Sequence, residues 1–212
     1  MSLETGIIYM TKYLLFLHIF IFSSCAQFTI QDYKTVYEAA FLKGDNDISI
    51  TKEYVDSREY SFAKVQIGDD VPAILVLAFI QNDLFVWISA EGQKLVTKNG
   101  KIIETYGLKY NFKVLDSRNY KLSQSEFNLS AQLDHPKAII KYNSKISTQF
   151  NQDLIDRNVK GSFLYSEEYS SSPIKWRGKN FYWVDPITNL TIRTNQSIHP
   201  YEDRMLIDFY YK

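Results

Sequence analysis

The stretch from Leu84 to Leu108 constrains the fold of this chain more than any other, because it has the pattern of three short strands joined by tight turns. In Leu84–Ala90, aliphatic and aromatic side chains alternate with the period of two expected for a strand. Asn99-Gly100 is a strong hairpin signal, since both central residues of a type I′ turn need a positive φ. Two further short strands are expected at Lys94–Thr97 and Ile102–Tyr106.

Further strands are expected on both sides of this meander, wherever apolar residues alternate or form short runs between turn residues. They are expected at Phe62–Ile67, Val71–Ile80, Ala138–Ser144, Asn158–Ser166, Phe181–Asp185, Leu190–Gln196 and Met205–Tyr211. The polar segment Asn111–Asp134 gives only weak alternation. We therefore expect a mainly β protein, with one strongly twisted antiparallel sheet or barrel-like meander, because a long open sheet would expose its edges.

Two helices are expected before the sheet. Apolar residues recur at helical spacing over Ile30–Lys43, and Gly44 follows as a stop signal. Thr51 is placed to cap a brief second helix that ends near Arg58. We expect the first helix to pack against the sheet.

The first 24 residues have the features of a secretory signal peptide. Lys12 precedes the apolar run Tyr13–Phe22, which is too short to span a bilayer, and small residues follow. Phe22-Ser23-Ser24-Cys25 resembles a bacterial lipobox, whose cysteine thiol is acylated before cleavage. The alternative is an ordinary signal peptide that leaves a free thiol.

Acylation of Cys25 would anchor the mature chain stably, since each buried CH₂ contributes about 0.8 kcal/mol. By resemblance to sorted bacterial lipoproteins, Ala26 indicates the outer membrane, with the protein facing the periplasm. The expected organisation is a signal peptide over residues 1–24 and a single mainly β domain over residues 25–212.

Charge and cysteine content exclude several classes of protein. The chain has 24 basic and 24 acidic residues and a pI near 6.8, which argues against a nucleic-acid partner. Cys25 is the single cysteine, so no intramolecular disulfide and no cysteine-based zinc site can form.

Few residues suit catalysis, and we expect no catalytic residue, metal or cofactor. His135 and His199 each precede a proline, which favours extended turn geometry. The sequence has no nucleophile elbow, phosphate loop or dinucleotide fingerprint. The carboxylate pairs Glu167-Glu168 and Glu202-Asp203 are expected to be solvated surface charges, because adjacent residues on a strand point to opposite faces.

The three tryptophans could provide a platform for sugar rings, which stack on aromatic side chains. Trp87 and Trp183 lie within expected strands and are predicted to serve the core and cross-strand pairing. Trp176 lies in a loop-like stretch, Ser172–Gly178, and is expected to be exposed. It is the candidate ligand-contact residue.

Three pieces of the sequence together resemble the YjbF/GfcB family, the group 4 capsule polysaccharide lipoproteins of Gram-negative bacteria. They are the lipobox at Cys25, the segment Tyr60–Leu108, and Asn180–Gln196. The family pattern is matched by Trp87, Ser89, Glu91, Leu95–Thr97, Asn99-Gly100, Thr105, Gly107 and Leu108, and again by NFYWVD at 180–185. Asn189 stands where the family often has glycine. The resemblance implies a mainly β, periplasm-facing lipoprotein linked to capsule or exopolysaccharide secretion.

Three functions remain open at this point. The first is a non-enzymatic accessory in polysaccharide export that binds polymer or export-machinery proteins. The second is a periplasmic carrier of a lipid-linked or lipidated molecule, which would need a large apolar cavity in a half-barrel. The third and least expected is a polysaccharide-modifying enzyme, which would need two carboxyls that converge in a groove.

Overall fold

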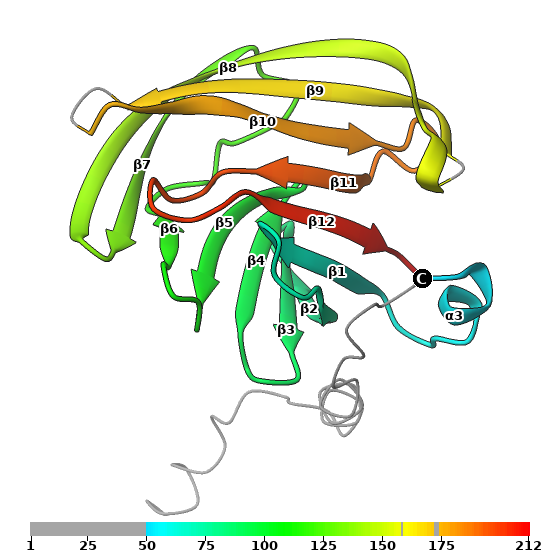
Figure 1. Cartoon of the computed structure of the whole chain (residues 1–212). Coiled ribbons are helices and arrows are strands. Elements are labelled where there is room, and N and C mark those ends of the chain that lie inside the picture. Colours follow the sequence, from blue (N-terminus) through cyan, green and yellow to red (C-terminus); the bar gives the residue numbers. More distant parts are fainter. Residues whose placement is uncertain (1–49, 158, 172–173) are drawn as a thin grey trace, which may run out of the picture. The chain divides into compact units, whose positions relative to one another are not determined.

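Figure 1 shows a computed structural model that describes residues 50–157, 159–171 and 174–212. The predicted signal peptide, Cys25 and the helix at Ile30–Lys43 lie outside the described residues.

The described residues form twelve antiparallel strands that close into a barrel, and each strand pairs with its neighbours in sequence. The last strand pairs with the first and completes the ring, with Phe62 opposite Tyr210 and Ile67 opposite Met205. The strands are β1 (Phe62–Ile67), β2 (Ala73–Gln81), β3 (Leu84–Ser89), β4 (Lys94–Lys98), β5 (Lys101–Tyr106), β6 (Phe112–Val114), β7 (Glu126–Asp134), β8 (Lys137–Leu154), β9 (Val159–Ser171), β10 (Trp176–Val184), β11 (Thr191–Gln196) and β12 (Met205–Tyr210). The predicted mainly β, barrel-like fold is confirmed.

The turn between β4 and β5 has the predicted geometry. Asn99 and Gly100 have φ values of 49° and 77°, the left-handed region that a type I′ turn requires. A side chain at Gly100 would collide with Thr191, at the start of β11, so glycine is also needed for the close approach of the two segments. Asn189 has a φ of 58°, which explains how asparagine replaces a glycine in the β10–β11 turn.

The structure contains more strand than the sequence pattern indicated between residues 112 and 171. β8 has 18 residues and β9 has 13, and Figure 1 shows them as the longest pair in the barrel. In β7, Phe127, Leu129, Ala131 and Leu133 are buried and the residues between them are mostly exposed. Polar residues on the outward face made this alternation look weak in the sequence.

Among the described residues, two short helical segments accompany the barrel: α3 (Lys52–Asp56) and the 3₁₀ turn η2 (Ile155–Arg157). The Thr51 hydroxyl accepts a hydrogen bond from the backbone N–H of Tyr54 at 3.2 Å, so the predicted cap is confirmed. Tyr54 packs edge-on against Phe62 of β1, with ring centroids 5.6 Å apart.

One side of the barrel interior is packed with apolar side chains. Trp87 is fully buried and its ring lies 5.1 Å from that of Phe209. Met205, Ile207 and Phe209 share the inner face of β12, as predicted, and all are buried. We call this region the apolar half; it comprises Ala63, Val65, Leu75, Trp87, Leu95, Met205, Ile207 and Phe209.

Candidate functional site

Glu167 lies on the inner face of β9 and is fully buried. Its two carboxylate oxygens accept hydrogen bonds from the Nζ of Lys101, on β5, at 2.7 and 2.8 Å. Lys101 is 3% exposed, so both charges of this ion pair are removed from water. Because an unpaired buried charge costs several kcal/mol, each residue depends on the other.

Neutral side chains complete the hydrogen bonding of this carboxylate. The Ser144 hydroxyl donates to Oε1 at 2.6 Å, and the Asn180 amide donates to Oε2 at 3.2 Å. The Tyr182 hydroxyl also donates to Oε2. The donors come from β8 and β10, the two strands that flank Glu167 on β9, so the carboxylate joins three neighbouring strands.

Gln196, on β11, links this group to the facing strand β5. Its amide nitrogen donates to the carbonyl of Gly100 at 2.8 Å, and its oxygen accepts from the backbone N–H of Ile102 at 3.1 Å. We call the whole group the Glu167 cluster; it comprises Lys101, Ser144, Glu167, Asn180, Tyr182 and Gln196.

The pKa of Glu167 lies below its ordinary value. Burial alone would raise the pKa of this carboxyl, but the positive charge and hydrogen bonds of Lys101, with those of Ser144 and Tyr182, have the larger combined effect. Burial, and then the negative charge of Glu167, raise the pKa of Tyr182 well above its ordinary value. At neutral pH the carboxyl is therefore ionised and the tyrosine is protonated.

The Glu167 cluster joins neighbouring and facing strands and has little empty space beside it. The cavity beside it, lined in part by Lys101, Tyr142 and Asn180, has a volume of about 10 Å³. That is about the space that one water molecule needs. The Tyr142 hydroxyl is buried there with no hydrogen-bond partner among the described residues.

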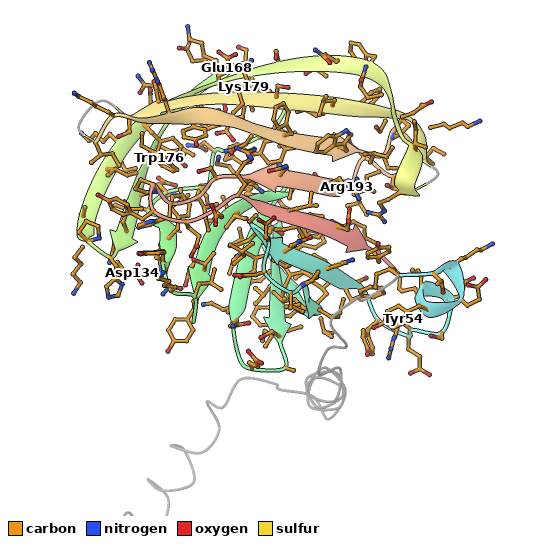
Figure 2. The ribbon with its side chains drawn as sticks, in the orientation of Figure 1. Tyr54, Asp134, Glu168, Trp176, Lys179 and Arg193 are labelled. Atoms are coloured by element: carbon orange, nitrogen blue, oxygen red, sulfur yellow. The ribbon has the colours of Figure 1, made fainter. Side chains whose placement is uncertain are left out.

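The prediction that Glu167 and Glu168 are both solvated is wrong for Glu167. The two side chains do point to opposite faces of β9, as expected for neighbours on a strand. Glu168 lies outside, where it pairs with Lys179 at 2.7 Å (Figure 2). The sequence carries a signal for the burial of Glu167, because it shares its strand face with Phe163, Tyr165 and Tyr169, which also line the interior.

The second carboxylate pair, Glu202-Asp203, lies in the connection between β11 and β12, where Asp203 is exposed and Glu202 is half-buried. Burial raises the pKa of Glu202. The structure brings neither acid near the Glu167 cluster.

The two histidines of the described residues occupy turns, as predicted. His135 is exposed between β7 and β8, and its Nδ1 lies 3.2 Å from Asp134 (Asp134 is labelled in Figure 2). His199 is fully buried and stacks on Tyr110 with a centroid separation of 4.9 Å. Burial lowers the pKa of His199.

The prediction that Trp176 is exposed is wrong. It is the first residue of β10, is 9% exposed, and packs against Tyr169 with ring centroids 4.7 Å apart. Gly178, which has the character of a loop residue in the sequence, lies within the strand. A side chain there would meet the Tyr169 hydroxyl at 2.6 Å, so the glycine provides space for that tyrosine.

Trp176 also lines one edge of a surface pocket of about 310 Å³ at the end of the barrel that carries the β7–β8 turn. Tyr201 and Ile174 line the same pocket and are exposed. We call this hollow the Trp176 pocket. Contact between Trp176 and a ligand there stays a prediction.

A second pocket, of about 320 Å³, lies at the end of the barrel that carries the β4–β5 turn. Its lining is rich in cations and amides, so we call it the cationic pocket. Its lining includes Asp83, Lys98, Asn99, Arg118, Lys121 and Asn189. None of them was singled out from the sequence as a site residue, because they come from four separate connections.

Over residues 50–212, apart from the gaps at 158 and 172–173, no group of three or more His, Cys, Asp or Glu side chains converges as a metal site would require. Within the same part of the chain, no helix has the length and apolar character needed to cross a bilayer.

Comparison with known proteins shows which family this chain belongs to. The family described as "Group 4 capsule polysaccharide lipoprotein gfcB, YjbF" matches residues 34–209, which include all twelve strands. The chain belongs to this family. The resemblance seen in the sequence motifs is thus confirmed, and it extends through the polar segment that gave little pattern.

Two relatives from Escherichia coli strain K12 agree with this assignment. The chain is 21% identical over 171 residues to "Uncharacterized lipoprotein GfcB", covering 75% of this chain and 79% of that protein. It also resembles the crystal structure of the hypothetical lipoprotein YmcC, with a TM-score of 0.71 and 18% identity, over 89% of this chain and 98% of that one. The second likeness supports the barrel fold. The family description and both names contain the word lipoprotein, as the sequence motif at Cys25 predicts.

Proposed function

We propose that this protein is a non-enzymatic accessory in the secretion of capsule polysaccharide or exopolysaccharide, and that it binds the polymer. Membership of a capsule polysaccharide lipoprotein family supports the general role. The observation that carries the choice of polymer binding is the contrast between a barrel filled by side chains and surface hollows of sugar-binding size, among them one at each end of the barrel.

The barrel interior does not favour the alternative of a lipid carrier. An acyl chain would need a large apolar cavity, and ligand pockets usually measure about 300–1,000 Å³. The space beside the Glu167 cluster is about 10 Å³, and Trp87 and Phe209 are packed against each other across the apolar half. The cationic pocket and the Trp176 pocket open to the surface, where a polymer can reach them.

The arrangement of the carboxylates supports a non-enzymatic role. Glycoside hydrolysis needs two carboxyls about 5–9 Å apart in an open cleft. Glu167 is fully buried and paired with Lys101, whereas Glu168 faces the opposite side of the strand.

Cys25 is proposed as the site of lipid attachment, with residues 25–212 as the mature single domain. The protein would then face the periplasm from the outer membrane. Changing Cys25→Ser should release the protein into the soluble periplasmic fraction, measured by fractionation and immunoblotting. A Cys25→Ser protein that stayed in the outer-membrane pellet would contradict the anchor.

Deletion of the gene tests the role in secretion. Secreted polysaccharide should fall in amount or in chain length, measured by sugar analysis and by gel filtration of the medium. Expression of the unchanged gene from a plasmid should restore it. Normal yield and normal polymer length in the deletion strain would count against the proposed function.

A further inference from the structure

We propose that the cationic pocket binds an acidic saccharide unit, a sugar ring that carries a carboxylate. This inference rests on the proposed function, since it names the part of the polymer that is recognised and the surface that recognises it. The pocket volume of about 320 Å³ is at the lower end of the range for ligand pockets, which fits a short saccharide segment.

Lys98 is the first reason for this assignment. Only 9% of this residue is exposed, and its ammonium donates hydrogen bonds to the backbone carbonyls of Ser117 and Arg118 at 3.2 and 3.0 Å. No carboxylate of the described residues forms an ion pair with it, and Asp116, whose carboxylate feels its charge, is itself paired with Arg118. A mostly buried cation held by neutral carbonyls still lacks a counter-charge in contact with it, and a ligand carboxylate would supply one.

Lys98 differs in this respect from Lys101, three residues further along the same hairpin. Lys101 has a carboxylate partner, Glu167, and faces the barrel interior. Lys98 lines the cationic pocket instead. The two lysines are buried to a similar degree, so the missing carboxylate at Lys98 is a specific feature of the pocket.

Two further cations line the same pocket. Lys121 is exposed, and Arg118 is exposed and held by Asp116 through Nε at 3.1 Å and Nη2 at 2.8 Å. Asp83 is the acidic residue of the lining. With Asp116, which pairs with Arg118, three cations face two carboxylates, so the pocket keeps a net positive charge, which favours an anionic ligand.

The neutral part of the lining suits a sugar ring. Asn99 and Asn189, from the β4–β5 and β10–β11 turns, offer amide groups that can both donate and accept hydrogen bonds with hydroxyls. Tyr165, on the inner side of β9, adds an aromatic side chain. The positive φ values of both asparagines belong to tight turns, so these amides are held on a rigid frame.

The Trp176 pocket, which is of similar size, lacks this combination. Its lining is largely apolar and aromatic, with Lys175 and Arg177 as its cations and without an amide side chain among the residues that line it. A third hollow, of about 880 Å³, lies over β8–β10, but its Lys145 and Lys179 are paired with Glu126 and Glu168. The buried Lys98, which has no carboxylate partner, therefore assigns the acidic unit to the cationic pocket.

Binding can be measured by isothermal titration of the purified full-length protein with trigalacturonic acid. The matched control ligand is its methyl ester, which keeps the rings and removes the charges. We expect the free acid to bind at least tenfold more tightly than the ester, because the ester cannot form charge-assisted hydrogen bonds with the cations of the pocket. Equal affinities for the acid and the ester would overturn the proposal.

Variants then locate the site. Lys121→Glu should weaken binding of the acid about tenfold, and Lys98→Met should weaken it at least as much. Lys137→Gln, an exposed lysine at the other end of the barrel, is the matched control and should leave affinity unchanged. If Lys98→Met fails to fold, the variant of the exposed Lys121 still tests the proposal. Unaltered affinity for the acid in Lys121→Glu would refute the assignment.

Competition with inorganic phosphate separates a saccharide site from a general anion site. Phosphate at the same concentration should displace little trigalacturonic acid, and full displacement would overturn the saccharide assignment. These outcomes are independent of the deletion experiment. Loss of secreted polymer without measurable binding would leave the accessory role standing and remove the pocket from it.

Discussion

The two sides of the barrel interior are built from different chemistry and from different strands: β1–β4 and β12 carry the apolar half, whereas β5 and β8–β11 carry the Glu167 cluster. The apolar half packs Trp87, Phe209 and their neighbours, and its stability grows with the apolar area removed from water, about 25 cal/mol per Å². The Glu167 cluster places an ion pair in the same closed space. This barrel combines a region that tolerates small losses with a region in which the two buried charges must be matched.

The difference matters because the two kinds of contact select structures differently. Apolar side chains attract one another in many arrangements, whereas the Lys101–Glu167 pair is satisfied in one. It joins β5 to β9 across the barrel, and Gln196 joins β11 to β5 in the same region. The cluster therefore fixes which strands face each other.

The largest expected effect comes from Glu167→Gln. This change keeps the shape of the side chain but leaves Lys101 buried without a counter-charge, so the free energy of unfolding should fall by about 3–5 kcal/mol. Urea denaturation measures it. The control is Glu168→Gln, which breaks an exposed pair with Lys179 and should leave the free energy of unfolding nearly unchanged. Equal losses for the two neighbours would show that Glu167 is not paired inside the barrel.

A smaller loss is expected in the apolar half from Trp87→Phe. The indole Nε1 donates to the Thr97 hydroxyl at 3.0 Å, so the change leaves a small cavity and a buried hydroxyl without that donor. We expect a loss of about 1–3 kcal/mol in the free energy of unfolding. Trp183→Phe, on the half-exposed outer face of β10, should cost less than about 1 kcal/mol. A larger loss for Trp183→Phe than for Trp87→Phe would mean that Trp183, and not Trp87, faces the barrel interior.

The double variant Lys101→Met with Glu167→Gln sharpens the comparison. Removing both charges leaves a neutral network in which the new amide side chain would still meet Ser144, Asn180 and Tyr182, so stability should return to within about 1–2 kcal/mol of the unchanged protein. Recovery of this kind is specific to a charge pair. If the two losses simply add, the residues do not act as a unit.

The smallest expected effect is on the pH dependence of stability. The folded pKa of Glu167 is lowered, so its contribution is present above the unfolded pKa, near 4.5, and is lost as pH falls through the lower folded value. The double variant should therefore lose less stability than the unchanged protein when pH falls below about 4.5. Thermal melts on either side of this pH measure the difference, and parallel curves would contradict it.

Much of the fold could be predicted from the sequence because local chemistry decides it. Asn99-Gly100 specified its turn, and the alternation in Phe62–Ile67 gave the bounds of β1. The candidate sites could not be predicted in the same way. Glu167 can be buried because it pairs with Lys101, which is 66 residues away in the sequence. The residues next to Glu167 in the sequence do not indicate that partner.

Trp176 shows a second reason for such errors. Pro173 and Gly178 on either side of it are typical of loops, but Gly178 lies in β10 because the Tyr169 hydroxyl occupies the space of its missing side chain. Lys98, Arg118 and Lys121 were equally hidden, since only the closed barrel brings the β4–β5 turn and the β6–β7 connection to one pocket. Residues that act through distant contacts leave little trace in a local pattern.

The pairing of β1 with β12 has a consequence for how the protein forms. About 140 residues separate the partners, so the ring can close only once β12 is available to pair with β1, and such distant contacts are slow to form. Until then, β1 and β11 are edge strands whose unpaired backbone N–H and C=O groups can pair with neighbouring molecules. A chain cut before Met205 would keep both rows exposed permanently, and we expect it to aggregate.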